Sequence, residues 1–149
     1  INAMISEPLR NNQYIASNSN SARFTGSETQ LDWRLSPADR LRLTYAYVDA
    51  KASNPDDQNL TARNSGSAGW MHDWGRGWSS AVFYYGDDAL NQYRFERVDL
   101  RVAKRFALPR ASLELSGTLQ QRLDDEPTSK IDNRYDSRHL LYFSAELEF

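Results

Sequence analysis

The chain has 149 residues, a net charge of −2 and no cysteine. The lack of cysteine excludes a disulfide framework and thiolate metal sites, and without a basic stripe nothing indicates a nucleic-acid partner. No run approaches the roughly 18 apolar residues that a membrane helix needs, which excludes a helical membrane protein. A membrane β-barrel is not excluded, because its strands expose only alternate residues to lipid.

The chain opens at Ile1, without an initiator methionine or a signal peptide, and residues 1–5 read like the middle of a strand. We therefore expect residues 1–149 to be the C-terminal portion of a longer polypeptide. Apolar and polar residues then alternate with period two in many segments, which is the pattern of half-exposed strands. The predicted strands are 1–7, 22–35, 41–50, 63–74, 78–86, 94–106, 111–123 and 138–149.

The last predicted strand has the clearest alternation. One face carries Leu141, Phe143, Ala145, Leu147 and Phe149. The other face carries Tyr142, Ser144, Glu146 and Glu148. In 111–123, leucines alternate with polar residues in the same way, so we expect Leu113, Leu115 and Leu119 to point outward with the apolar set of the last strand.

The predicted connections alternate between short and long. Gly and Pro residues mark tight turns at 36–40, 75–77 and 107–110. Longer polar links lie at 51–62, 87–93 and 124–137. This sorting is typical of bacterial outer-membrane barrels, which have short periplasmic turns and long extracellular loops. The last strand would then end at the periplasm.

Aromatic residues gather at the ends of the predicted strands. The tight-turn ends carry Trp33, Trp74, Trp78, Phe106 and Phe149. The long-loop ends carry Tyr47, Tyr84 and Tyr85. Such rings favour the membrane–water boundary, so we interpret them as two aromatic girdles. The alternative is that they form the core of a soluble β-sandwich.

The end of the chain resembles the C-terminal signature of outer-membrane β-barrel proteins, a terminal Phe preceded by apolar residues at every second position. The positions that match are Leu141, Phe143, Leu147 and Phe149. The resemblance implies that the barrel-assembly machinery reads this strand as an assembly signal.

The wider pattern over about 22–149 resembles the barrel of TonB-dependent receptors. Gly26-Ser27-Glu28 is similar to the Gly-x-Glu strand of that family, and segments 41–50 and 97–102 are similar to later strands. The resemblance implies a barrel of about 22 strands with an N-terminal plug, of which this chain would be roughly the last third. It also implies a Gram-negative outer membrane, coupling to the TonB complex through the missing N-terminal part, and import of an iron–siderophore or similar metal chelate.

Five charged residues lie opposite the apolar faces and are predicted to face the barrel lumen: Arg42, Glu114, Arg122, Glu146 and Glu148. On the lipid face an Arg or Lys would cost roughly 2–4 kcal/mol at the bilayer midplane. They would pair with each other or with a plug. The same residues would also suit the solvent face of a soluble sheet.

Other candidate sites are weak. His72 and His139 lack metal-ligand spacing, and Ser79 and Ser80 lack the G-x-S-x-G context of a nucleophile. The acidic pairs Asp56-Asp57, Asp87-Asp88 and Asp124-Asp125 fit solvated loops better than a cation site. We predict neither an enzyme nor a cofactor.

We therefore predict an all-β antiparallel transmembrane β-barrel, present as its C-terminal strands and not closed on itself, from a TonB-dependent importer. Two alternatives remain open: a small outer-membrane barrel with a porin or structural role, and a soluble β-sandwich binding module.

Overall fold

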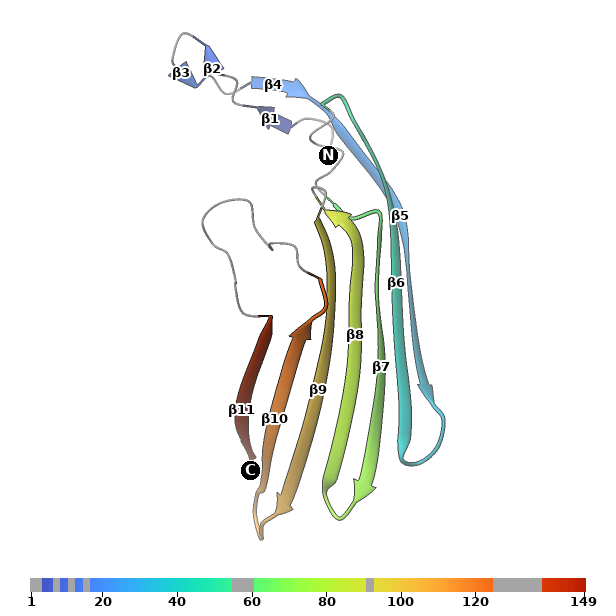
Figure 1. Cartoon of the computed structure of the whole chain (residues 1–149), viewed down its shortest axis with the longest axis vertical. Helices are drawn as coiled ribbons and strands as arrows, with labels where there is room; N and C mark the ends of the chain where they lie inside the picture. The colour runs from blue at the N-terminus through green and yellow to red at the C-terminus, as the bar shows by residue number, and fades with distance from the viewer. Residues whose placement is uncertain are drawn as a thin grey trace.

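One antiparallel sheet holds seven strands of the computed structural model, which describes residues 4–6, 9–10, 13–14, 17–54, 61–90, 93–124 and 138–149. The strands cross the sheet in chain order, each paired with the one before it (Figure 1). They are β5 Ala22–Arg34, β6 Asp39–Ala52, β7 Asn64–Gly75, β8 Trp78–Leu90, β9 Tyr93–Ala107, β10 Ser112–Arg122 and β11 His139–Glu148. The all-β antiparallel architecture predicted from the alternation is confirmed.

The N-terminal residues do not add the predicted eighth strand to this sheet. Instead, β1 (Met4–Ser6) pairs with β4 (Ser17–Asn20), and β2 (Leu9–Arg10) pairs with β3 (Gln13–Tyr14). The prediction of a sheet strand at 1–7 is therefore wrong. The sequence supplies only a short alternating stretch before Pro8, and proline has no N–H to donate to a strand ladder.

Glycine permits the tightest of the three short turns. Gly75, Arg76 and Gly77 all have positive φ, at 76°, 52° and 77°. The Gly75 N–H also donates to Asp73 Oδ1 at 2.7 Å. A Cβ atom on Gly77 would lie 2.3 Å from the Arg105 carbonyl oxygen. This turn therefore requires glycine at its end for space as well as for conformation.

The other two short turns are closed by hydrogen bonds. The Ser36 hydroxyl accepts from the backbone N–H groups of Ala38 at 3.1 Å and Asp39 at 2.9 Å. The Leu108 N–H donates to the Ala111 carbonyl at 2.8 Å. All three predicted turns are confirmed, with bounds shifted by one or two residues.

The long link predicted at 87–93 is wrong, because β8 continues to Leu90 and β9 begins at Tyr93. Asp87 lies opposite Phe95 in this extension. Asp88 is held there by the Arg63 N–H at 2.7 Å and the Asn64 Nδ2 group at 2.6 Å. These contacts come from a neighbouring connection, so local polarity alone misled the prediction. The connections after β6 and β10 do remain long.

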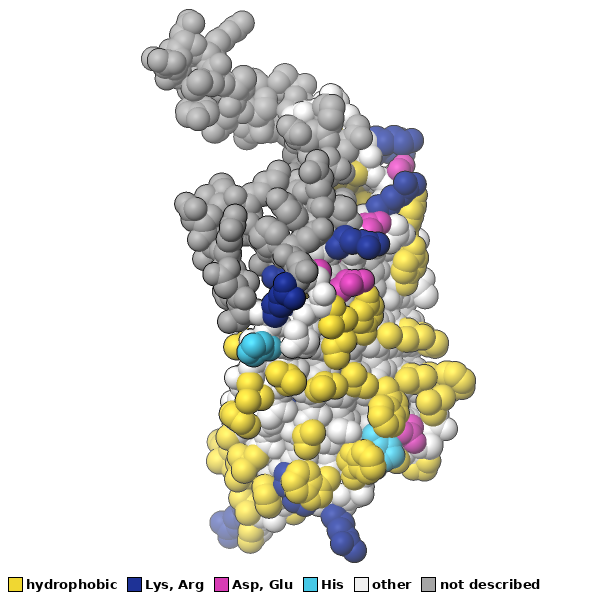
Figure 2. Space-filling view, viewed as in Figure 1, with side chains coloured by type: hydrophobic (Ala, Val, Ile, Leu, Met, Phe, Trp, Pro, Cys, Tyr) yellow, Lys and Arg dark blue, Asp and Glu magenta, His cyan; other side chains and the backbone are white. Residues whose placement is uncertain are grey.

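The sheet has two chemically different faces. Neighbouring residues on a strand point to opposite sides, and paired residues share a side. We call the apolar side the outer face. Figure 2 shows its broad band of hydrophobic side chains, with charged side chains gathered above. It exposes the large side chains of Leu31, Trp33, Leu43, Tyr45, Trp70, Trp78, Tyr84, Leu100, Val102, Phe106, Leu115, Leu119, Leu141, Phe143, Leu147 and Phe149.

No hydrophobic core forms among the described residues. Ala22 and Ala103 are the buried apolar residues there, and no large side chain is fully buried. The leucines predicted to point outward behave accordingly: Leu115 is 43% exposed and Leu141 is 59% exposed, while Leu113 is half-buried. A single layer of strands thus leaves a continuous apolar surface uncovered.

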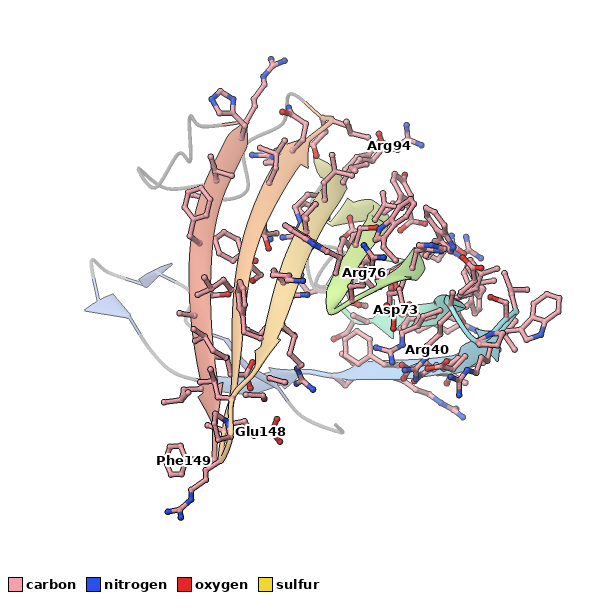
Figure 3. All side chains as sticks on the ribbon, turned by 90° about the horizontal axis from the view of Figure 1, so that it is seen from below. Arg40, Asp73, Arg76, Arg94, Glu148 and Phe149 are labelled. Atoms are coloured by element: carbon pink, nitrogen blue, oxygen red, sulfur yellow. The ribbon has the colours of Figure 1, made fainter. Side chains whose placement is uncertain are left out.

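The sheet remains open. Within the described residues β11 pairs only with β10 and β5 pairs only with β6, so the two edges do not meet. The sheet curves as an open arc (Figures 1 and 3). This agrees with the prediction that the last strand finds no partner near residues 1–7. Over the same described residues, no helix is long and apolar enough to cross a membrane.

Candidate functional site

The concave side of the arc, which we call the inner face, carries most of the paired charges. Its tight-turn half is a hollow lined by charged side chains that include Asp32, Arg34, Arg40, Asp73, Arg101, Arg105 and Glu114. The end of β11 shows how the two faces separate. In Figure 3, Glu148 turns toward the hollow, whereas Phe149 points away from it.

One inner-face cluster joins β5 to β6. Asp32 lies directly opposite Arg42 in the register. Arg40 donates through Nε to Asp32 Oδ1 at 2.5 Å and through a second nitrogen to Oδ2. Arg42 donates from Nη2 to Asp32 Oδ2 at 3.1 Å. The predicted lumen candidate Arg42 is therefore half of an ion pair whose partner, Asp32, was not singled out from the sequence.

A second cluster crosses β9, β10 and β11. Arg101 Nη2 donates to Glu114 Oε1 at 2.5 Å. Arg105 lies between two carboxylates, with Nε 3.7 Å from Glu114 Oε2 and Nη2 3.5 Å from Glu148 Oε2. The structure thus brings together two predicted candidates, Glu114 and Glu148, through arginines of β9. The signal in the sequence was the alternating charge of 97–105, whose register could not be known.

Glu146 occupies a different position in this network. It lies directly opposite Glu114 across the β10–β11 pair. Its side chain is exposed, and no hydrogen bond or ion pair is found for it within the described part of the chain. Like charges placed directly opposite each other destabilise a strand pair. The β11 end of the inner face therefore carries uncompensated negative charge.

A third group lies toward the long-loop end of the same face. Arg97 donates to Asp99 at 3.0 Å, and Gln120 donates to the same carboxylate at 3.0 Å. The predicted candidate Arg122 pairs with Asp124. Both of these side chains are largely covered, at 13% and 7% exposure. All five predicted lumen candidates are thus placed, and four of them form ion pairs.

Neutral hydrogen bonds and rings fill the space between the charges. Ser116 Oγ and Ser144 Oγ are 2.7 Å apart, and Thr44 Oγ1 and Ser67 Oγ are also 2.7 Å apart. Tyr85 lies among these inner-face residues, with the Arg97 guanidinium 4.8 Å from its ring centre. Its assignment to an outer aromatic girdle is therefore wrong, because the strand register turns it inward.

A polar cluster on the outer face lies near the tight turns. Asp39 Oδ1 accepts from Trp70 Nε1 at 3.0 Å and contacts His72 Nδ1 at 2.7 Å. The His72 ring is 4.3 Å from that of Trp74. Ser80 lies opposite His72, but its hydroxyl accepts from Trp74 Nε1 at 2.9 Å. His72 and Ser80 share no hydrogen bond within the described residues, because each bonds a different neighbour.

Lys104 interrupts the apolar side of β9, and the structure shows how it is accommodated. Its ammonium donates to the Arg76 carbonyl in the neighbouring tight turn. It also lies 5.1 Å from the Trp78 ring centre and 5.6 Å from that of Phe106. The charged head thus reaches the end of the sheet, while its aliphatic stem lies along the apolar band.

Members of two acidic pairs, Asp87 and Asp124, lie near enough to interact electrostatically, but they form no metal site in the part of the structure that is described. Asp87 and Asp88 lie within β8, while Asp56, Asp57 and Asp125 lie outside the described residues. No group of three His, Cys, Asp or Glu side chains suitable for a metal ion occurs in the described parts of the chain.

The predicted assembly-signal residues all lie on the outer side of the edge strand β11 or just after it. Leu141, Phe143, Leu147 and Phe149 are exposed by 59, 78, 56 and 97%. Comparison with known proteins adds no assignment: no protein-family model, no curated protein and no solved structure matches this chain.

Proposed function

We propose that the seven-stranded sheet is part of the wall of an outer-membrane β-barrel, with its outer face against lipid and its inner face lining the lumen. The observation that carries this proposal is the contrast between the faces. One face exposes large apolar side chains, such as Phe143 at 78%, and the other pairs its charges. A soluble sheet would need a second layer over the apolar face.

The strand lengths suit this role. The seven strands contain 10 to 15 residues each. A tilted strand needs about 9–11 residues to cross the hydrocarbon core. The tryptophans lie on the outer face toward the tight turns, where an apolar body and a polar N–H are both satisfied at a membrane boundary.

Within this class we propose an importer of the TonB-dependent type, carrying an iron–siderophore or similar metal chelate. The support is the likeness of 26–28, 41–50 and 97–102 to strands of that family, together with an arc that stays open over seven strands. An open arc is the shape expected from a section of a larger barrel wall. The barrel-assembly machinery and the TonB complex would then be its partners.

Tryptophan quenching tests the membrane orientation. The full-length protein would be folded into vesicles whose lipids carry bromine at defined acyl positions. We expect strong quenching by bromines near the headgroup and weaker quenching by deep ones, because Trp33, Trp74 and Trp78 lie near the tight-turn end. Emission that no brominated lipid quenches would contradict the proposal.

Uptake tests the importer. A strain lacking the gene would be complemented with the full-length protein and supplied with labelled ferric siderophores. Accumulation that requires an energised inner membrane is expected. If the protein instead lets small solutes pass without energy, the porin alternative is favoured.

A further inference from the structure

A basic cluster lies at the upper border of the apolar band, at the long-loop end of the outer face. It consists of Arg23 on β5, Lys51 on β6 and Arg63 just before β7, and we call it the upper basic cluster. Arg23 and Lys51 share the outer face with Leu31 and Leu43, since each is an even number of residues away along an unbroken register. All three basic side chains are exposed.

Arg23 and Lys51 face each other directly across the β5–β6 pair. Two like charges in this arrangement repel each other. Arg23 has no hydrogen bond or ion pair among the described residues, and Lys51 has a long one, with Nζ 3.8 Å from Asp49 Oδ2. The pair is therefore electrostatically unfavourable as it stands, and an anion between the two cations would relieve it.

Arg63 brings a third cation to the same border. Its Nη2 group donates to the Tyr47 hydroxyl at 3.1 Å, and its guanidinium lies 5.5 Å from the Tyr47 ring centre. That hydrogen bond raises the pKa of Arg63, so the group remains charged. Tyr47 lies directly below Asp49 on the outer side of β6, so the cluster begins where the apolar band ends.

We propose that the upper basic cluster binds the phosphate group of a lipid headgroup with net negative charge. Three cations beside two carboxylates, Asp49 and Asp88, leave net positive charge for an anion. Arg and Lys groups beside an apolar surface match a phosphate attached to acyl chains. The chains would lie over Tyr45 and Leu43, which are 51% and 40% exposed. This inference rests on the proposed function, because it needs the outer face in lipid.

Lipid retention tests the site. The full-length protein, in phosphatidylcholine vesicles containing a minor fraction of a phosphorylated glycolipid, would be extracted, and the copurified glycolipid measured by native mass spectrometry. The double variant Arg23→Gln/Lys51→Gln should bind the glycolipid about 25-fold more weakly. Each basic group contributes about fivefold to the affinity for an anionic lipid, and two are removed. The matched control Arg76→Gln/Arg110→Gln removes two arginines at the tight turns and should bind normally.

Equal binding by both variants and the unchanged protein would overturn the proposal. So would glycolipid that is displaced equally well by inorganic phosphate, since that would make the cluster a general anion site. Tryptophan quenching by brominated lipid, recorded on the same samples, separates the two claims. Normal quenching without glycolipid selectivity refutes the headgroup site alone, whereas absent quenching refutes the membrane orientation as well.

Discussion

At the scale of single residues, glycines decide how closely backbone and rings approach in this sheet. Gly69 lies on the inner face beneath Phe83, whose ring would be 2.1 Å from an added Cβ. On the outer face, Phe143 covers Gly117 in a similar way, at 3.3 Å. In both cases a ring on one strand fills the space above a glycine on the next. These contacts give a single-layer sheet some of the packing that it lacks without a core.

The turn at 75–77 allows two causes of glycine preference to be separated. In Gly75→Ala the new Cβ has no atom within 4 Å. The variant should therefore lower the free energy of unfolding only by the strain of an alanine in the left-handed conformation, about 1–2 kcal/mol. Gly77→Ala adds the clash with the Arg105 carbonyl and should cost clearly more. The measurement is urea unfolding of the full-length protein in vesicles. Equal losses for the two variants would show that the clash relaxes at no cost.

At the scale of the strand pair, the charge network on β10 and β11 provides another matched comparison. Glu114→Gln should destabilise the folded protein by roughly 1 kcal/mol, because it weakens contacts to Arg101 and Arg105 in a partly exposed setting. Glu146→Gln should be neutral or slightly stabilising, since it removes repulsion from Glu114. Both variants make the same chemical change, a carboxylate to an amide, on the same face of the sheet. A larger loss from Glu146→Gln would mean that this carboxylate has an essential partner.

Neighbouring positions on β11 test the assignment of the faces. Phe143 lies on the outer face, and Tyr142 lines a second hollow of the inner face, beside Ser116 and Ser144. Phe143→Arg should cost about 2–4 kcal/mol in a bilayer, the penalty for Arg at mid-depth. Tyr142→Arg, on the water-lined side, should be tolerated much better. Folding yield and urea midpoints in vesicles would report the difference. If Tyr142→Arg destabilised the protein more than Phe143→Arg, lipid would contact the inner face instead of the outer face.

The sequence predicted the strands well because each needs only a local alternation and a bounding turn. β5, β7 and β10 begin and end within one residue of the predicted 22–35, 63–74 and 111–123. The upper end of β8 was missed, because Asp88 is held by Arg63 and Asn64, which are distant in sequence. The partners Asp32, Arg101 and Arg105 were missed for the same reason. Register decides which charges meet, and register is a property of strand pairs rather than of single strands.

At the scale of the whole molecule, the sheet leaves two edges and one apolar face unsatisfied. The described part of β11 pairs on one side only, and so does β5. In lipid, an open edge leaves backbone groups without partners, so only a closed barrel is stable there. The described strands do not provide that closure. The proposed wall is therefore complete only when further strands pair with both edges.

Distance measurements across the arc test this directly. Leu31 on β5 and Leu147 on β11 both lie on the outer face near the tight-turn ends of the two edge strands. In a closed barrel of eight strands, a single strand would separate them, placing the two edges about 10 Å apart. In the open wall of a larger barrel they should be considerably farther apart.

Spin labels at Leu31→Cys and Leu147→Cys in the full-length protein would give this distance by pulsed electron paramagnetic resonance. The native chain has no cysteine to interfere within residues 1–149. The pair Gln121→Cys and His139→Cys, opposite each other on adjacent strands, serves as the short-distance control. We expect a long distance for the first pair, because seven strands curve only part of the way round. A distance near that of the control would indicate closure into a narrow barrel, and a structural or porin role would then replace import.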